Sequence, residues 1–144
     1  MPVAVPRAKY RARVAAALPD LAEQQLQIAV FDWLATVELR NAIVFHVPNG
    51  RKLDRLEAGL VNRLGVRKGV ADLAVMLEDG RQGWIELKSP KGELEREQGV
   101  FRQQCMRLGH HYLVCRNLQS VQHALVLWGV TWQQTELGGS FRTA

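Results

Sequence analysis

The sequence predicts an α/β fold in which a mixed central sheet is flanked by helices. Apolar residues recur at helical spacing in several stretches, and these alternate with short runs rich in β-branched and aromatic residues. An Asp79-Gly80 turn joins two of those runs, which is typical of a β-hairpin. A length of 144 residues without an internal repeat or a low-complexity linker favours one domain with one core.

The composition and the N-terminus narrow the class of protein. Hydrophobic residues make up 47% of the chain and charged residues 23%, which is typical of a globular protein and too apolar for a disordered one. The apolar stretch 121–130 is far shorter than the roughly 20 residues that cross a bilayer. The basic N-terminus lacks the apolar region of a signal peptide, and two cysteines are too few for a disulfide framework. We therefore expect a cytoplasmic protein without a membrane partner.

The first clear helix is expected to begin at Pro19-Asp20, because Asp20 is a favourable N-cap. The apolar residues that follow at helical spacing are Leu26, Val30, Trp33, Leu34 and Val37. On this interpretation residues 1–18 form a basic N-terminal arm, with partial helix over 11–18. Residues 19–132 form the folded domain, and residues 133–144 form a C-terminal tail.

The later elements follow from the same local signals. They are, in order, a strand at 41–47, a helix or an ordered loop at 52–64, a hairpin of strands at 72–77 and 83–88, a helix with an apolar face of Leu94, Phe101, Cys105 and Leu108, a strand at 111–115 and a helix at 118–127. Strands and helices in this order form a mixed sheet with helices packed against it.

The charge of the chain indicates the kind of partner. A formal net charge of +5 suits a polyanion, and nucleic acid is the commonest one. The basic residues form two groups in the sequence, Arg7, Lys9, Arg11 and Arg13 in the arm, and Arg51, Lys52, Arg55, Arg63, Arg67 and Lys68 in the middle. Solvated loops and helix faces are the alternative interpretation of either group.

Three charged residues interrupt the apolar pattern of the hairpin. Alternation places Glu86 and Lys88 on one face of the second strand, and pairing brings Asp72 beside Glu86. Two adjacent carboxylates repel unless a cation separates them, and oxygen ligands suit Mg²⁺. A neighbouring lysine can orient a water or stabilise charge on a phosphate. This arrangement is typical of a metal-dependent phosphodiesterase, whereas the alternative is a solvent-exposed ion pair.

Two further polar residues lie on apolar helix stripes. Gln98 is placed to face the sheet near Glu86, although it could equally cap its helix or contact the backbone. Glu23 continues the core-facing stripe of the first helix, but Asp20-x-x-Glu23 also matches a capping box.

At these residues the chain resembles a known family. Gly65–Leu73 and Trp84–Gly92, followed by Leu94 and Gln98, look like a VRR-NUC domain. This virus-type replication-repair nuclease belongs to the PD-(D/E)xK superfamily, whose core is restriction-endonuclease-like. The resemblance covers most of the chain, from about residue 23 to residue 115, and suggests a stand-alone protein of bacterial or phage type.

The resemblance also assigns roles to individual residues. It implies that Asp72 and Glu86 ligate Mg²⁺ or Mn²⁺ with the Leu87 carbonyl, and that Glu23 adds to the metal site. Lys88 would be the catalytic lysine, and Gln98 the helix glutamine of the extended motif. One departure is Ala71, where the family commonly has proline; this change removes no ligand.

A second set of residues would bind nucleic acid. His46 and Asn49 match a polar cluster beside the site in the family, and Arg67 and Lys68 match a basic pair that contacts phosphate. We expect Arg51 and Lys52, from the same basic group, to bind nucleic acid as well.

The leading interpretation is a divalent-metal-dependent DNA endonuclease that resembles a junction resolvase and acts on branched DNA as a homodimer. The last helix, with Trp128 and Trp132, is a candidate dimer surface, although both tryptophans suit an ordinary core equally well. The alternatives are a structure-insensitive or restriction-like endonuclease, and a DNA-binding module that no longer cuts. The spacing of Cys105 and Cys115 does not match a zinc site.

Overall fold

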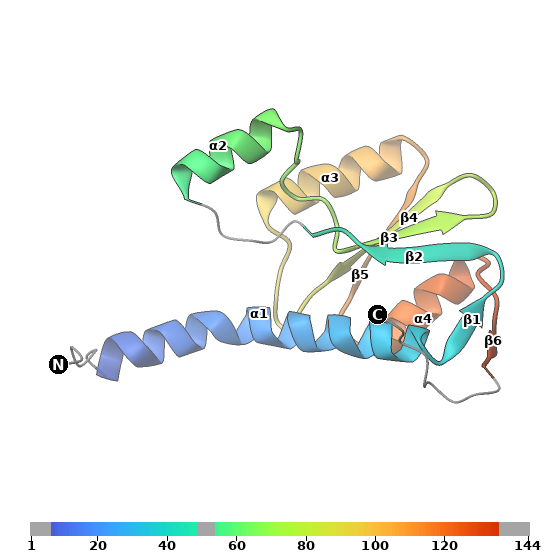
Figure 1. The fold of residues 1–144 in the computed structure, drawn as a ribbon, viewed down its shortest axis with the longest axis horizontal. Helices are drawn as coiled ribbons and strands as arrows, with labels where there is room; N and C mark the ends of the chain where they lie inside the picture. Colours follow the sequence, from blue (N-terminus) through green and yellow to red (C-terminus); the bar gives the residue numbers. More distant parts are fainter. Residues whose placement is uncertain (1–6, 49–53, 136–144) are drawn as a thin grey trace.

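The computed structural model describes residues 7–48 and 54–135, with side chains from residue 21 onward. Its centre is a four-stranded sheet in the order β2-β3-β4-β5 (Figure 1). The strands are β2 (Ala42–His46), β3 (Leu73–Leu77), β4 (Gln82–Leu87) and β5 (His111–Cys115). The first three strands are antiparallel, and β5 runs parallel to β4. The predicted strands, hairpin and mixed sheet are therefore confirmed.

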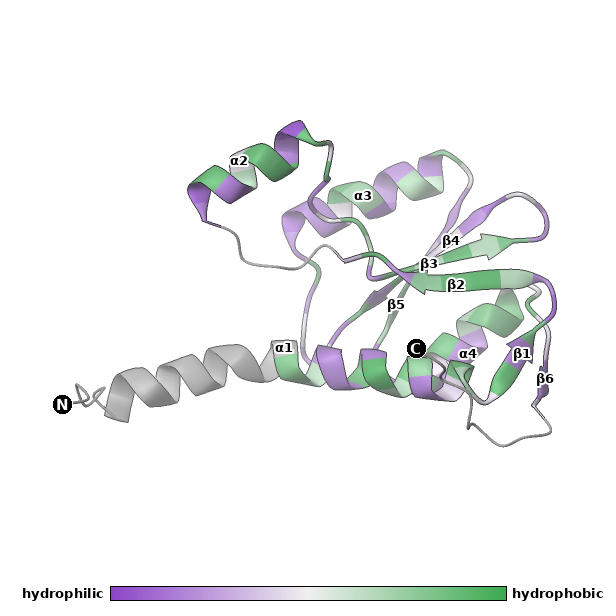
Figure 2. Ribbon diagram, viewed as in Figure 1, coloured by the Kyte–Doolittle hydropathy of each residue, from purple (hydrophilic) through white to green (hydrophobic). Residues whose placement is uncertain are grey.

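Helices cover both faces of this sheet. Helix α1 (Arg7–Leu34) and helix α4 (Leu118–Leu127) lie on one side, and α3 (Arg96–Arg107) lies on the other (Figure 1). Helix α3 forms the connection between the parallel strands β4 and β5, as a parallel crossover requires. Figure 2 shows hydrophobic residues concentrated in the central strands and in α4, while hydrophilic residues are frequent in α3.

The core divides into two clusters, as the alternation along β4 predicts. Ile85 and Leu87 are fully buried on the face covered by α1 and α4, together with Val30 and Leu125. Trp84 points to the opposite face, where it packs with its ring edge against Phe101 of α3, their centroids 5.1 Å apart. This alternation leaves Glu86 and Lys88 on the α3 side of the sheet.

The first helix differs from the prediction. It begins at Arg7 and continues through Pro19, so Asp20 lies inside the helix and is not its N-cap. The alanine-rich segment before Pro19 has high helix propensity, which offsets the cost of an interior proline. Much of the residue range assigned to a basic arm is therefore part of one helix of 28 residues.

The region for which the sequence predicted either a helix or an ordered loop forms a helix, α2 (Arg55–Arg63). Asp54 caps it through a reciprocal box, in which the Glu57 amide donates to Asp54 Oδ1 at 2.8 Å and the Asp54 amide donates to Glu57 Oε2 at 3.4 Å. The Asp54-x-x-Glu57 spacing is the sequence signal for this start. None of its residues is buried.

Two short strands were not expected from the sequence. Strand β1 (Val37–Leu39) pairs antiparallel with β6 (Trp132–Gln134) in a separate two-stranded sheet. Val37 therefore belongs to a strand and not to the apolar stripe of the first helix, and Gln133 and Gln134 of the expected tail belong to β6.

The prediction also placed Leu108 wrongly. Leu108 is the C-cap residue of α3 and is 67% exposed, so it does not lie on the apolar face of that helix.

The two tryptophans of the C-terminal region pack within the chain. Trp132 contacts Trp33 edge to face with centroids 5.2 Å apart, and Trp128 stacks on His111 at 5.5 Å. Both are only partly buried but pack against the main core cluster, which favours the core interpretation over a dimer surface.

Of the helices that the structure describes, none is both long enough and apolar enough to span a bilayer.

Candidate active site

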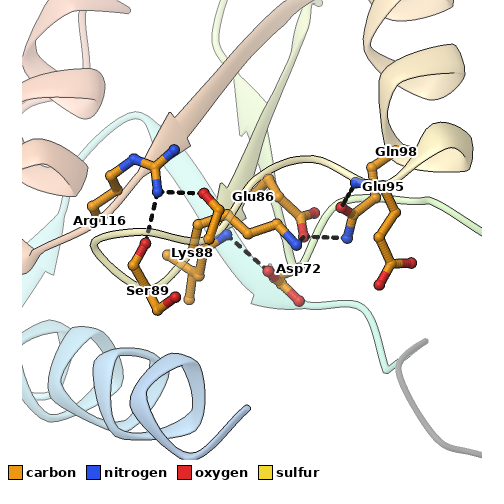
Figure 3. Close-up of polar contacts among 9 residues, drawn as sticks. Asp72, Glu86, Lys88, Ser89, Glu95, Gln98 and Arg116 are labelled. Carbon is orange, nitrogen blue, oxygen red and sulfur yellow. Dashed lines mark hydrogen bonds and ion pairs between the residues drawn. The ribbon is translucent and has the colours of Figure 1, made fainter. Parts of the chain in front are cut away.

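The end of the hairpin brings the predicted acidic residues together. Leu73 pairs with Ile85, so Asp72 and Glu86 follow in register on adjacent strands. The Leu87 amide donates a hydrogen bond of 2.8 Å to Asp72 Oδ2, which fixes the Asp72 carboxylate against β4 (Figure 3). The expected juxtaposition of the two carboxylates is present.

His46 lies at the end of the neighbouring strand β2. The Asp72 carbonyl accepts hydrogen bonds of 2.8 Å from the Val47 amide and from His46 Nδ1. A carbonyl oxygen only accepts, so this contact places a proton on Nδ1. In the neutral imidazole, Nε2 therefore keeps its lone pair. His46 thus belongs to the group of residues around Asp72.

Glu86 and Lys88 are buried, which rules out the solvent-exposed ion pair. Glu86 is 3% exposed and Lys88 6%. Lys88 Nζ lies 3.8 Å from Glu86 Oε1. The same Oε1 accepts a hydrogen bond of 2.7 Å from Gln98 Nε2, whereas Glu86 Oε2 is buried and receives no hydrogen bond from a donor among the described residues. A buried carboxylate oxygen in this state is costly unless a further group binds it.

Gln98 has both of the roles that its position left open. Its Nε2 donates to Glu86, and its Oε1 accepts from the Glu95 amide at 2.8 Å at the start of α3 (Figure 3). The backbone amide can only donate, so the orientation of the Gln98 side chain is fixed. Gln98 links the N-terminus of α3 to the acidic pair.

Burial and mutual repulsion dominate the electrostatics of this pair. Burial, followed by the charge of Asp72, raises the pKa of Glu86 from 4.5 to about 8, although the Lys88 ammonium opposes the shift. Burial also raises the pKa of Asp72, against the hydrogen bond from Leu87 and the electrostatic effects of the nearby His46 and Lys88. The site therefore favours extra positive charge, either a proton or a cation.

The donor atoms suit a hard divalent cation. Asp72 and Glu86 offer carboxylate oxygens, one of them unpartnered, which is the ligand type of Mg²⁺ and Mn²⁺. Within residues 21–48 and 54–135, no three His, Cys, Asp or Glu side chains gather as a metal-binding group. The remaining ligands would have to be carbonyls, waters or substrate oxygens, as is usual for Mg²⁺.

Glu23 lies within electrostatic reach of this centre. Its negative charge contributes to the raised pKa of Glu86. The alternative capping box with Asp20 is wrong, because α1 starts many residues earlier. Glu23 is partly buried on the helix that covers the other face of the sheet.

The basic pair ahead of Asp72 is exposed and borders a hollow beside α3. The Arg67 guanidinium lies 5.6 Å from the centre of the Phe101 ring and donates to Gln104 Oε1. Arg67 and Lys68 line a cavity of about 400 Å³ together with Asn62, Arg96, Glu97 and Val100. Asn49, Arg51 and Lys52, the other expected nucleic-acid contacts, lie outside the described residues.

Gly69 is a residue of the site that the sequence interpretation missed. Its φ is +84°, and a Cβ there would lie 2.3 Å from the Glu97 carbonyl oxygen and 2.8 Å from the Gln98 amide nitrogen. Only glycine allows the loop before Asp72 to approach the first turn of α3 so closely. The glycine three residues ahead of Asp72 was the available signal.

Comparison with known proteins identifies the type of fold. The mixed sheet carries the acidic pair and the lysine at one end of its central strands. A solved structure described as "VRR_NUC domain protein" matches with a TM-score of 0.56 and 18% sequence identity, over 74% of this chain and 86% of the other. No protein-family model matches the sequence, and no curated protein matches it either. The chain has the fold of a VRR_NUC domain protein, which confirms the resemblance at the level of fold.

Proposed function

We propose that this protein is a divalent-metal-dependent DNA endonuclease that hydrolyses phosphodiester bonds. The observation that carries the proposal is the buried Glu86 Oε2, which receives no hydrogen bond within the part of the chain that the structure describes and lies beside Asp72 and the buried Lys88. A fold that only binds DNA has no need to bury Glu86 and Lys88 at this cost and to hold Asp72 beside them. The likeness to a VRR_NUC domain protein supports the same class of activity.

The residues have complementary roles in this proposal. Asp72 and Glu86 would hold a Mg²⁺ or Mn²⁺ ion, with the Leu87 carbonyl and Glu23 as the further expected contributors. When bound, the ion polarises the scissile phosphate and lowers the pKa of a bound water. Gln98 keeps Glu86 Oε1 in a fixed direction, so Oε2 remains available.

Lys88 is the candidate catalytic residue. Its ammonium lies beside Glu86 and is nearly excluded from solvent, so it can donate a hydrogen bond to the attacking water or to a phosphate oxygen. Desolvation strengthens this interaction, because few water molecules compete for the ammonium.

The DNA would be held mainly through its phosphates. A net charge of +5 supports this mode, and the proposed contacts are Arg67, Lys68, Arg51, Lys52, His46 and Asn49. We propose branched DNA, such as a four-way junction, as the preferred substrate and a homodimer as the active form. A structure-insensitive endonuclease with the same centre is the alternative that the test must separate.

The test uses a labelled four-way junction and a linear duplex of the same sequence. Each is incubated with wild type and with K88A in Mg²⁺, Mn²⁺ or EDTA. Metal-dependent cleavage of the junction alone, lost in K88A, supports the full proposal. Equal cleavage of both substrates keeps the endonuclease and overturns the junction preference. Binding of DNA without cleavage in any metal overturns the enzyme in favour of a binding module.

A further inference from the structure

We propose that Arg116 is a positioning residue, which holds the turn after Lys88 and thereby sets the position of the lysine side chain. The proposal rests on the proposed function, since it concerns the geometry of the candidate catalytic lysine. Arg116 lies just after β5, outside the motifs that the sequence singled out.

One guanidinium nitrogen of Arg116 contacts three carbonyl oxygens of the turn formed by residues 89–92. Nη1 donates to the Ser89 and Gly92 carbonyl oxygens at 2.6 Å each, and lies 3.4 Å from that of Pro90 (Figure 3). The Gly92 amide closes the turn with a hydrogen bond of 3.1 Å to the Ser89 carbonyl. Hydrogen bonds from a charged donor are stronger than neutral ones, so Arg116 stabilises this turn even though its side chain is exposed.

The turn lies beside the lysine side chain. A Cβ at Gly92 would lie 3.5 Å from Lys88 Cδ and 2.8 Å from Ser89 Oγ, so the backbone of the turn packs beside the aliphatic part of Lys88. The Lys88 amide donates to the Cys115 carbonyl at 3.0 Å, which anchors the residue immediately before Arg116 to the same point. A shift of the turn would therefore move the Lys88 side chain.

The same turn leads to the other partner of Glu86. After Gly92 the chain continues to Glu95, whose amide donates to Gln98. Lys88 and Gln98 approach Glu86 from the two ends of this connection. Because Arg116 binds the segment between Lys88 and Gln98, it helps to keep both of these residues in position beside Glu86.

Among the described residues, Arg116 has no carboxylate partner that would compete with the turn. Within the described part of the chain, its side chain bonds only to the three carbonyls, and no carboxylate pairs with it. Its own backbone is fixed separately, because the Arg116 amide donates to Ser120 Oγ at 3.2 Å at the start of α4. The guanidinium thus connects the turn to a firmly held element.

The test compares R116M with R116K. Since one nitrogen makes all the contacts, a lysine ammonium can replace much of them, whereas methionine can replace none. We expect R116M to lower kcat between about tenfold and a hundredfold at saturating metal, with KM for DNA unchanged, because a small misplacement of a catalytic group has effects of this size. R116K should recover most of the loss. R107M, which removes an exposed arginine at the end of α3, is the control with matched charge and should keep wild-type kcat.

A second readout does not depend on cleavage. The NMR signal of the Lys88 Cε–Hε group, assigned with K88R, should shift in R116M and stay near its wild-type position in R116K and R107M. If R116M does not fold, R116Q takes its place in both measurements. An increase of KM with unchanged kcat would mean that Arg116 binds DNA, and it would overturn the proposal, as would an unshifted Lys88 signal. If wild type cuts no DNA, the nuclease proposal fails, while the Lys88 signal still decides the role of Arg116.

Discussion

Replacing Glu86 with glutamine should make the metal-free protein more stable, even though it removes a residue of the proposed active site. Folding raises the pKa of Glu86 from 4.5 to about 8. The folded state therefore favours the protonated carboxyl. This contribution to stability is fully present below pH 4.5 and is lost as the pH rises through about 8.

The size of the effect follows from the same values. At about 1.4 kcal/mol per pH unit, the interval from 4.5 to about 8 corresponds to an upper limit of about 5 kcal/mol above pH 8. Glutamine keeps an acceptor for Gln98 and carries no charge. E86Q should thus unfold roughly 10 °C higher than wild type well above pH 8, and the gain should shrink toward pH 5.

The assay is thermal unfolding in EDTA across this pH range, with E93Q as the control. Glu93 is exposed, so its replacement should leave the unfolding temperature unchanged. Addition of Mg²⁺ should stabilise wild type more than E86Q, because the substitution removes one of the two carboxylates proposed to bind the ion. If E86Q is no more stable than wild type at high pH, or gains the same amount at every pH, the reasoning about the buried carboxylate is refuted.

Three further substitutions test other parts of the site. D72N should weaken Mg²⁺ binding by roughly tenfold or more in calorimetry, and an unchanged affinity would remove Asp72 from the metal site. R67A should lower the affinity for all DNA sequences by a similar factor and reduce the salt dependence by about one unit of slope; a loss confined to certain sequences would contradict a phosphate contact. G69A should destabilise the fold by about 2–4 kcal/mol in denaturant unfolding, because the added methyl group displaces the first turn of α3. Since Gln98 lies in that turn, the folded fraction of G69A should also cleave DNA more slowly than wild type. Wild-type stability in G69A would show that the close approach is not required.

The parts of the fold that were predicted correctly are those with local signals. The hairpin around Asp79-Gly80 has a strong turn signal, and its strands have the alternation that places Glu86 and Lys88 on one face. The stripe on α3 likewise placed Gln98 toward the sheet, where it does contact Glu86. Periodicity identifies which side of an element a residue faces, and here that was sufficient to assemble the acidic pair.

The features that were missed depend on contacts between distant parts of the chain. Strands β1 and β6 are short and have no clear alternation, and they form only because Val37 pairs with Gln134, which is distant in the sequence. Helix α1 passes through Pro19, where a local rule predicts a boundary. The need for glycine at position 69 becomes visible only when α3 is packed against the loop.

The measurement that tests the central claim most directly is the cleavage rate of a labelled four-way junction as a function of Mg²⁺ concentration, for wild type, K88A and K91A, with DNA binding measured in parallel by fluorescence anisotropy. Lys91 is exposed on the turn that follows Lys88, so it controls for the loss of one positive charge. The account predicts that K88A binds the junction with near wild-type affinity and does not cut it at any Mg²⁺ concentration, whereas K91A cuts it. Cleavage by K88A at the wild-type rate, or cleavage by wild type that persists in EDTA, would contradict a metal-dependent centre built on Asp72, Glu86 and Lys88.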